Sequence, residues 1–185
     1  ADKGCIGSCA FVWGYQTHGA VLTWYGLFDK MGYSSASVDE LQYSWIGSYP
    51  AKKAPAITNR NSMLIDNSLK ADSNVILKAS TMHTAKVTSS STTGETLTYD
   101  WRIYKEGAHA SDGSLPDGIA GLIENPTVAS ISFRSPATVG NYRLLVFVKD
   151  VANKKFASAV IPFNVEKNTG TNSDPEDWTP GNISW

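Results

Sequence analysis

Six strand-like segments follow Pro50, and this run restricts the possible folds more than any other feature of the sequence. Each segment is short, rich in β-branched and aromatic residues, and bounded by turn residues. The segments are NVILKAS, HTAKVTSS, LTYDWRIYKEG, VASISFRS, NYRLLVFVKD and SAVIPFNVE. Six or seven short strands with this spacing indicate an antiparallel β-sandwich. The sequence therefore predicts a mainly β protein.

The alternation of side chains is clearest in the third segment. Leu97, Tyr99, Trp101 and Ile103 occupy every second position. Because successive side chains of a strand point to opposite faces, these four share one face of the predicted sheet.

The pattern before Pro50 is different. Residues 9–15, CAFVWGY, are apolar and uncharged, which is typical of a short strand buried on both faces. Residues 34–47, SSASVDELQYSWIG, have the pattern of an amphipathic helix. A strand, an aromatic loop and a helix together make one β/α unit.

The predicted helix carries its own start and stop signals. Ser37 is the expected N-cap, with Glu40 three positions later as in a capping box. Gly47 is expected to end the helix. The predicted buried stripe consists of Val38, Leu41, Trp45 and Ile46.

These patterns divide the chain into four parts. We expect the β/α unit in residues 1–50, a linker rich in proline and lysine in residues 51–56, the sandwich in residues 57–166, and a polar tail in residues 167–185.

A polar turn before the strand LTYDW, and the later strand GNYRLLVFVKD, form a recognisable pair of motifs within residues 55–166. This part of the chain resembles the PKD-type, immunoglobulin-like modules that are appended to bacterial secreted enzymes. The resemblance implies that Trp101 is the core tryptophan between the sheets, and that Tyr142 is a corner tyrosine that bonds back to the backbone. The acidic turn of these modules is replaced here by SSSTTGE, so we do not expect a calcium-stiffened turn.

The opening residues also carry a motif, GSCAFVWGYQTHGAVLTWYGLF followed by SSASVDELQYSWIGSYP. Over about 50 residues this resembles the last β/α unit of a glycoside hydrolase (β/α)8 barrel (TIM barrel), in the broad group that includes family 2. The resemblance implies that Trp13 lies at the carboxyl end of the eighth strand, the face where barrel active sites are built.

A sugar-binding role follows for the aromatic and polar residues near this strand end. An indole ring can stack on the apolar face of a pyranose, and amide or imidazole groups can bond its hydroxyls. The substrate-binding residues that the resemblance implies are Trp13, Gln16, His18, Trp24 and Tyr25. Packing in the core is the alternative interpretation for each aromatic residue.

Glycoside hydrolysis needs two carboxylates that flank the scissile bond. In the barrel group they sit on the fourth and seventh strands, which would lie upstream of Ala1. Asp39 and Glu40 fall in the first turn of the predicted helix, where the helix dipole explains them, and Asp29 matches no catalytic position. We expect no catalytic residue in this chain and no hydrolysis of sugars by it.

The two cysteines are Cys5 and Cys9. A disulfide is the favoured interpretation if the protein is secreted, and two buried thiols are the alternative. A zinc site is the weakest option, because two thiols supply half of the ligands and the histidines are scattered. We therefore expect neither a metal nor a cofactor.

Composition excludes further classes of function. The formal net charge is −1, so nothing favours nucleic acid or an anionic membrane surface as a partner. No apolar run reaches the roughly 20 residues of a membrane helix. The chain contains no GxSxG elbow, no phosphate-binding loop and no HExxH motif. Sparse charge and abundant Ser, Thr and Asn suit an extracellular or cell-surface location.

Three functions remain open. The first is the non-catalytic C-terminal portion of a secreted carbohydrate-active enzyme. The second is an extracellular assembly subunit that pairs with its own copies through residues 9–30. The third is a sugar-binding module. A single β/α unit cannot close a barrel, so its strand must pair with the sandwich, with another copy, or with the missing barrel. Carbohydrate is the expected ligand if the barrel is complete.

Overall fold

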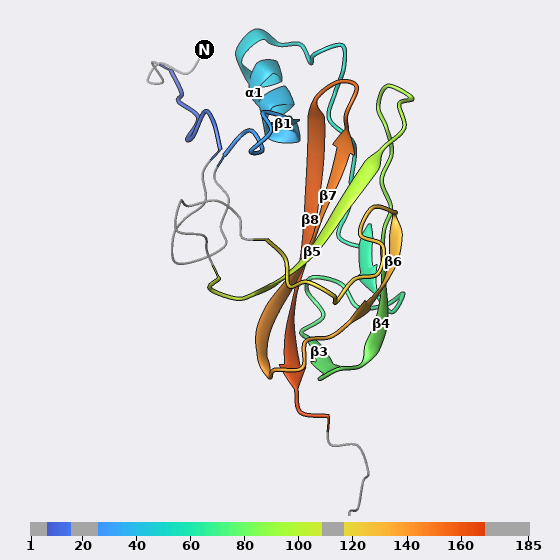
Figure 1. Ribbon diagram of the computed structural model, residues 1–185. Helices are drawn as coiled ribbons and strands as arrows, with labels where there is room; N and C mark the ends of the chain where they lie inside the picture. The colour runs from blue at the N-terminus through green and yellow to red at the C-terminus, as the bar shows by residue number, and fades with distance from the viewer. Residues whose placement is uncertain (1–6, 16–25, 109–116, 169–185) are drawn as a thin grey trace, which may run out of the picture.

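The computed structural model describes residues 7–15, 26–108 and 117–168 (Figure 1). One short strand and one helix precede seven further strands. The elements are β1 (Ser34–Ser35), α1 (Ala36–Ile46), β2 (Met63–Ile65), β3 (Val75–Lys78), β4 (Met82–Val87), β5 (Thr98–Lys105), β6 (Ser130–Arg134), β7 (Gly140–Asp150) and β8 (Lys155–Glu166). The prediction of a mainly β protein is confirmed.

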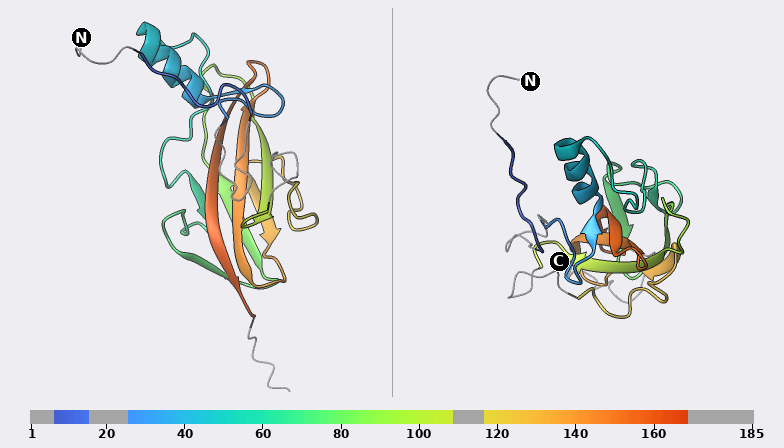
Figure 2. Two further views of the ribbon diagram at one scale, coloured as in Figure 1. Left: turned by 90° about the vertical axis from the view of Figure 1, so that its left-hand side faces the viewer. Right: turned by 90° about the horizontal axis from the view of Figure 1, so that it is seen from above.

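The strands form two sheets that pack face to face (Figures 1 and 2). In the larger sheet, β5, β7 and β8 are antiparallel neighbours, and β1 and β3 both pair in parallel with β8. The smaller sheet contains β2, β4 and β6, all antiparallel. This order matches the ABE and CFG sheets of an immunoglobulin-like sandwich. The two parallel pairs are an addition to the antiparallel arrangement that the sequence predicts.

The core between the sheets contains the residues expected there. Trp101 is 2% exposed, and its indole N–H donates a hydrogen bond of 2.8 Å to the carbonyl oxygen of Val128. Tyr142 is buried as well, and its hydroxyl donates to the carbonyl oxygen of Thr138 at 2.9 Å. The core tryptophan and the corner tyrosine are both confirmed.

The helix forms almost where it was predicted, but it begins earlier. Its N-cap is Ser35, in extended conformation (φ −79°, ψ 167°) and without a side-chain capping bond, so the expected capping box at Ser37 is wrong. The reason is that β1 ends at Ser35 and the chain turns directly from strand into helix. Gly47 ends the helix as expected, with φ 75° and its N–H bonded to the carbonyl oxygen of Tyr43.

The predicted strand in residues 9–15 is not formed. Phe11 and Trp13 are 70% and 61% exposed, so the segment is not buried on both faces either. Its backbone still takes part in pairing, because the N–H of Leu27 donates to the carbonyl oxygen of Val12 at 3.2 Å. The segment has this neighbour on one side, which is too little for a doubly buried strand.

The N-terminal residues extend the larger sheet beyond β1. The N–H of Phe28 donates to Gly14, and the N–H of Ser35 donates to Leu27. Residues 12–14, residues 27–29, β1 and β8 therefore follow one another in a ladder of backbone hydrogen bonds. The residues expected to end a barrel are joined here to the sandwich of their own chain.

The predicted linker packs against the sandwich. Ala54 is 5% exposed, and Ala56 forms an isolated antiparallel bridge with Ser90. The hydroxyl of Thr92 donates to the carbonyl oxygen of Lys53 at 2.7 Å. These contacts place residues 53–57 beside the sandwich, between α1 and β2.

Candidate functional site

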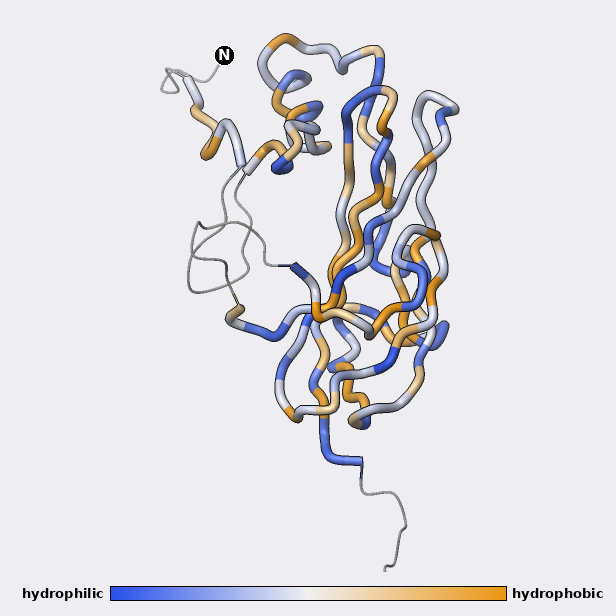
Figure 3. Tube along the Cα trace, viewed as in Figure 1, coloured by the Kyte–Doolittle hydropathy of each residue, from blue (hydrophilic) through white to orange (hydrophobic). Residues whose placement is uncertain are grey.

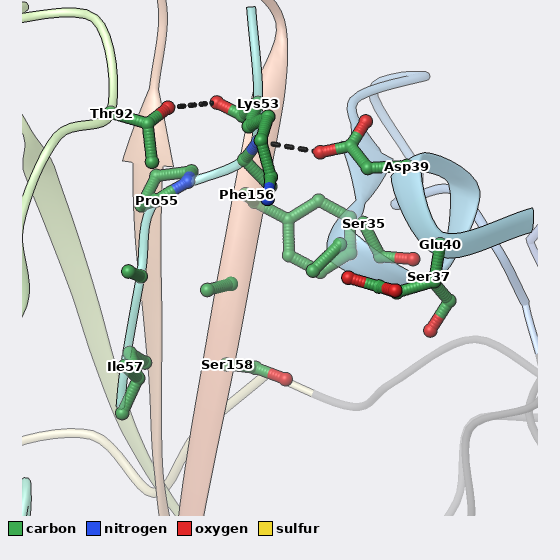
Figure 4. A pocket seen from close by; sticks show the side chains of 14 residues that line it. Ser35, Ser37, Asp39, Glu40, Lys53, Pro55, Ile57, Thr92, Phe156 and Ser158 are labelled. Carbon is green, nitrogen blue, oxygen red and sulfur yellow. Dashed lines mark hydrogen bonds between the residues drawn. The ribbon is translucent and has the colours of Figure 1, made fainter. Parts of the chain in front are cut away.

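A buried ion pair fixes α1 on the sandwich. Asp39, in the first turn of α1, is 2% exposed, and one of its carboxylate oxygens accepts from the ammonium group of Lys155 at the start of β8. The other oxygen accepts from the N–H of Ala54 at 2.7 Å (Figure 4). The sequence offered no signal for this pair, because its partners lie 116 positions apart.

A second buried carboxylate shapes the turn before β1. Asp29 is 8% exposed, and its Oδ1 accepts from the N–H groups of Met31 and Tyr33 at 2.9 and 2.8 Å. Its Oδ2 lies 3.9 Å from the ammonium group of Lys149 on β7. Asp29 therefore holds the turn together and faces the sheet, a structural role that the sequence left unassigned.

A cavity of about 420 Å³ lies where α1, residues 53–57 and β8 meet (Figure 4). Its polar lining includes Ser37, Glu40, Lys53 and Ser158, and its apolar lining includes Phe156. The carboxylates of Asp39 and Glu40 and the ammonium group of Lys53 line the cavity. The ammonium group of Lys155 lies beside it, because it pairs with Asp39. Their charges balance, so the cavity favours an uncharged occupant.

Large exposed aromatic side chains are confined to one part of the described chain. Among the described residues, every aromatic side chain of this kind belongs to residues 7–49, whereas the exposed large side chains of the sandwich are aliphatic. We call these five residues the N-terminal aromatic set: Phe11, Trp13, Tyr43, Trp45 and Tyr49. Figure 3 shows hydrophobic stretches of residues 7–15 and of α1 at the same end of the molecule.

Hydrogen bonds and ring contacts connect this set across two segments. The indole N–H of Trp45 donates to the hydroxyl of Ser8 at 3.0 Å, which ties α1 to the N-terminal segment. Trp13 meets Phe28 edge to face, with ring centroids 5.2 Å apart. Trp13 and Trp45 are nevertheless 61% and 50% exposed, so their ring surfaces remain available to a partner.

A stack of rings follows the end of α1. Tyr43 and Tyr49 lie nearly parallel, with centroids 4.5 Å apart, and the ammonium group of Lys53 lies 3.7 Å above the ring of Tyr49. The hydroxyl of Tyr49 donates to Glu40 at 2.9 Å. This hydrogen bond, with a smaller contribution from desolvation and from the charge of Glu40, raises the pKa of Tyr49. Glu40 is thereby engaged as an acceptor.

The predicted buried stripe of α1 is only half correct. Val38 and Leu41 are partly buried, but Trp45 and Ile46 are 50% and 68% exposed. The cause is visible in Figure 2, where α1 projects past the end of the sandwich. The helix contacts β1 and β8, with Asp39 of its first turn paired to Lys155, whereas residues 43–49 are all exposed.

The sequence-predicted sugar site is only partly described. Trp13 is exposed, as a ligand-facing side chain must be. The other four members, Gln16, His18, Trp24 and Tyr25, lie outside the described residues.

The predicted disulfide also involves a residue outside the described ranges. Cys9 is exposed, and its expected partner Cys5 is not described, so the bond stays a prediction. Within the described ranges, no group of three or more His, Cys, Asp or Glu side chains could hold a metal ion. None of the described helices combines the length and the apolar character needed to cross a membrane.

Comparison with family models finds no match, and no curated protein matches the sequence. Among solved structures, the chain is similar to a nucleoside hydrolase-related hypothetical protein from Saccharophagus degradans that is associated with carbohydrate metabolism. The sequence identity is 20% and the TM-score is 0.42, over 71% of this chain and 31% of that one. The match thus covers about a third of that protein, and the similarity between the two is distant.

Proposed function

We propose that this chain is the non-catalytic C-terminal portion of a secreted carbohydrate-active enzyme. In this proposal a PKD-type sandwich carries a unit that completes the end of a catalytic (β/α)8 barrel. The observation that carries the proposal is the N-terminal aromatic set, which leaves the unit with an apolar surface of the kind that a neighbouring barrel unit would cover. The sequence resemblance of residues 1–50 supports the same partner.

The energetics of burial favour a partner over solvent at this surface. Burying one large apolar side chain is worth roughly 1.5–3 kcal/mol. Phe11, Trp13 and Trp45 are 70%, 61% and 50% exposed, so leaving them in water forfeits about 3–5 kcal/mol, a large share of a domain's stability of about 5–15 kcal/mol. Contact with the rest of a barrel would recover most of it.

The contacts between the unit and the sandwich would transmit this interaction to the sandwich. The pair between Asp39 and Lys155 and the turn built on Asp29 both fasten the unit to the larger sheet. A sandwich attached in this way would hold the last unit of the barrel in a fixed position.

The carboxylates of the unit support a non-catalytic role. Asp39 is bound by Lys155, Asp29 by backbone N–H groups, and Glu40 by the hydroxyl of Tyr49. Among the described residues of the unit, each of these three carboxylates therefore takes part in a structural contact.

The size of the native polypeptide tests the proposal. An antibody raised against this chain should detect, in the culture medium of the source organism, a species several times larger than 20.0 kDa. Peptide mass spectrometry of that species should then recover sequence upstream of Ala1. A native species of 20.0 kDa would contradict the proposal.

Residues 9–15 favour a second candidate function, a self-associating assembly subunit. This stretch is uncharged, and its Phe11 and Trp13 side chains are exposed in the isolated chain. A subunit of this kind would cover them with another copy of itself.

The sugar-binding module has a different test. It would be retained on insoluble polysaccharide, and Trp13→Ala would abolish that retention.

A further inference from the structure

The last strand, β8, leaves part of its edge unpaired. β7 pairs along the whole of one side of β8. On the other side, β1 pairs with residues 155–156 and β3 with residues 163–166. Among the described strands, nothing pairs with residues 157–162 on that side. The left view of Figure 2 shows β8, in red, at the border of its sheet.

The direction of the backbone groups in this gap follows from its two ends. The N–H of Ser34 donates to the carbonyl oxygen of Lys154, and the N–H of Ala79 donates to that of Glu166. Alternate residues of a strand direct their backbone groups to the same side. Even-numbered residues of β8 therefore point away from β7.

Two residues in the gap consequently present both a donor and an acceptor. Ser158 and Val160 direct their N–H and C=O groups outward, while Pro162 at the next outward position has no N–H. Sheet edges are normally protected by charged side chains, bulges or covering segments. Residues 157–162, ASAVIP, contain no charge, and their one protective residue is the proline.

The cavity described above opens on the upper end of this gap. Ala157 and Ser158 line it on the side of β8, and Pro55 and Ile57 line it on the opposite side. An added strand would find backbone partners on one side of this space and an apolar wall on the other. The balanced charge of the cavity favours an uncharged strand.

We propose that residues 9–15 of a second copy of this chain pair with β8 at this gap. This proposal rests on the second candidate function, self-association. The gap of six residues measures about 20 Å, and seven extended residues span about 23 Å. The segment is uncharged throughout. In extended form its small residues, Ala10, Val12 and Gly14, share one face and can approach the apolar wall.

A second copy fits this role better than the same chain does. Within one chain, residues 12–14 are held by residues 27–28, so β1 and residues 27–29 separate them from β8. Exchange between copies gives up contacts that include the bonds from Leu27 and Phe28 and the ring contact of Trp13 with Phe28. It gains the backbone groups of Ser158 and Val160, two donors and two acceptors, as partners.

Sedimentation velocity of the full chain over a range of micromolar concentrations tests the proposal. We expect reversible association for the wild type. Ser158→Pro removes one outward N–H without touching the bonds to β7, so association should weaken at least about tenfold. The matched control Ser158→Ala keeps the N–H and should associate like the wild type. Circular dichroism melting checks that both variants are folded.

A second variant protects the test against misfolding of the proline variant. Val160→Lys keeps the backbone intact and adds a charge to a side chain that is already 36% exposed, so it should fold and associate weakly. A capped peptide of residues 9–15 should compete with association. Wild-type chain that stays monomeric, or association that survives Ser158→Pro and Val160→Lys, would overturn the proposal. Neither result bears on the first proposed function, which is tested separately by the size of the native polypeptide.

Discussion

Asp39 and Lys155 form a buried ion pair that joins the first turn of α1 to the first residue of β8. The same carboxylate also accepts from the N–H of Ala54. One side chain thus holds together three segments that are distant in sequence: the helix, the segment after it, and the last strand. The position of Tyr43, Trp45 and Tyr49, which lie on α1 or just after it, depends on this contact.

Removal of one partner should therefore be costly. Asp39→Asn leaves the ammonium group of Lys155, whose side chain is only 13% exposed, without its counter-charge. We expect the free energy of unfolding to fall by about 3–5 kcal/mol, measured by urea denaturation. Arg60→Ala breaks an exposed ion pair with Asp72 and serves as the control, with an expected loss below about 1 kcal/mol. Equal losses in the two variants would show that the buried pair has no special role.

Trp101 should carry a large share of the stability of the sandwich. Trp101→Ala removes a fully buried indole, so we expect a loss of about 3–5 kcal/mol in the free energy of unfolding. Trp101→Phe keeps most of the apolar volume but leaves the carbonyl oxygen of Val128 without its donor, and the loss should be smaller. Chemical denaturation followed by circular dichroism measures both. A loss below about 1 kcal/mol for Trp101→Ala would contradict the core assignment.

Asp150 should make the stability of the protein sensitive to acid. Burial opposes its ionisation, but hydrogen bonds from Asn153 and Thr93 outweigh burial, so the pKa of Asp150 lies below its ordinary value of 3.8. Since the folded pKa is the lower one, the carboxylate stabilises the fold above pH 3.8. That contribution is lost as the pH falls through the folded pKa.

Unfolding measurements from neutral to acidic pH check this expectation. Asp150→Asn should be less stable than the wild type at neutral pH, and the difference should shrink in acid. Thr93→Val keeps the carboxylate and removes one donor, so it should show a smaller effect of the same sign. A constant difference between Asp150→Asn and the wild type at every pH would refute the role of ionisation.

The purified chain should not hydrolyse glycosides. The carboxylates of Asp29, Asp39 and Glu40 are bound in structural contacts, and the resemblance assigns both catalytic carboxylates to strands upstream of Ala1. Release of nitrophenol from a panel of aryl glycosides measures the activity. Turnover that co-purifies with the chain through successive chromatographic steps would contradict the prediction.

The sandwich strands were predictable because their signal is local. Alternation in residues such as Tyr99 and Trp101 depends on the strand alone. β3, β5 and β6 lie within the segments expected, and β4, β7 and β8 begin one to three residues before theirs. β2 was missed because its three residues are followed directly by Asp66 and Asn67, both in left-handed conformation, so the strand is too short to show a period.

The N-terminal errors have a different cause. The apolar residues 9–15 predict burial, but a sequence pattern does not state which segment would bury them, and within one chain residues 27–28 are a neighbour on one side only. The role of Asp39 was hidden for a related reason. Its partner Lys155 lies at the other end of the chain, and a lone aspartate in a first helical turn is already explained by the dipole.

The parallel pairing of β1 and β3 with β8 has a consequence for the order in which the protein is made. Both strands are synthesised well before residues 155–166, and neither can complete its parallel pair until those residues leave the ribosome. Asp39 cannot meet Lys155 until the 116 positions that separate them have been synthesised. Until then β1 and α1 lack their contacts with β8, and an incompletely folded nascent chain is open in that interval to capture by chaperones or by other copies.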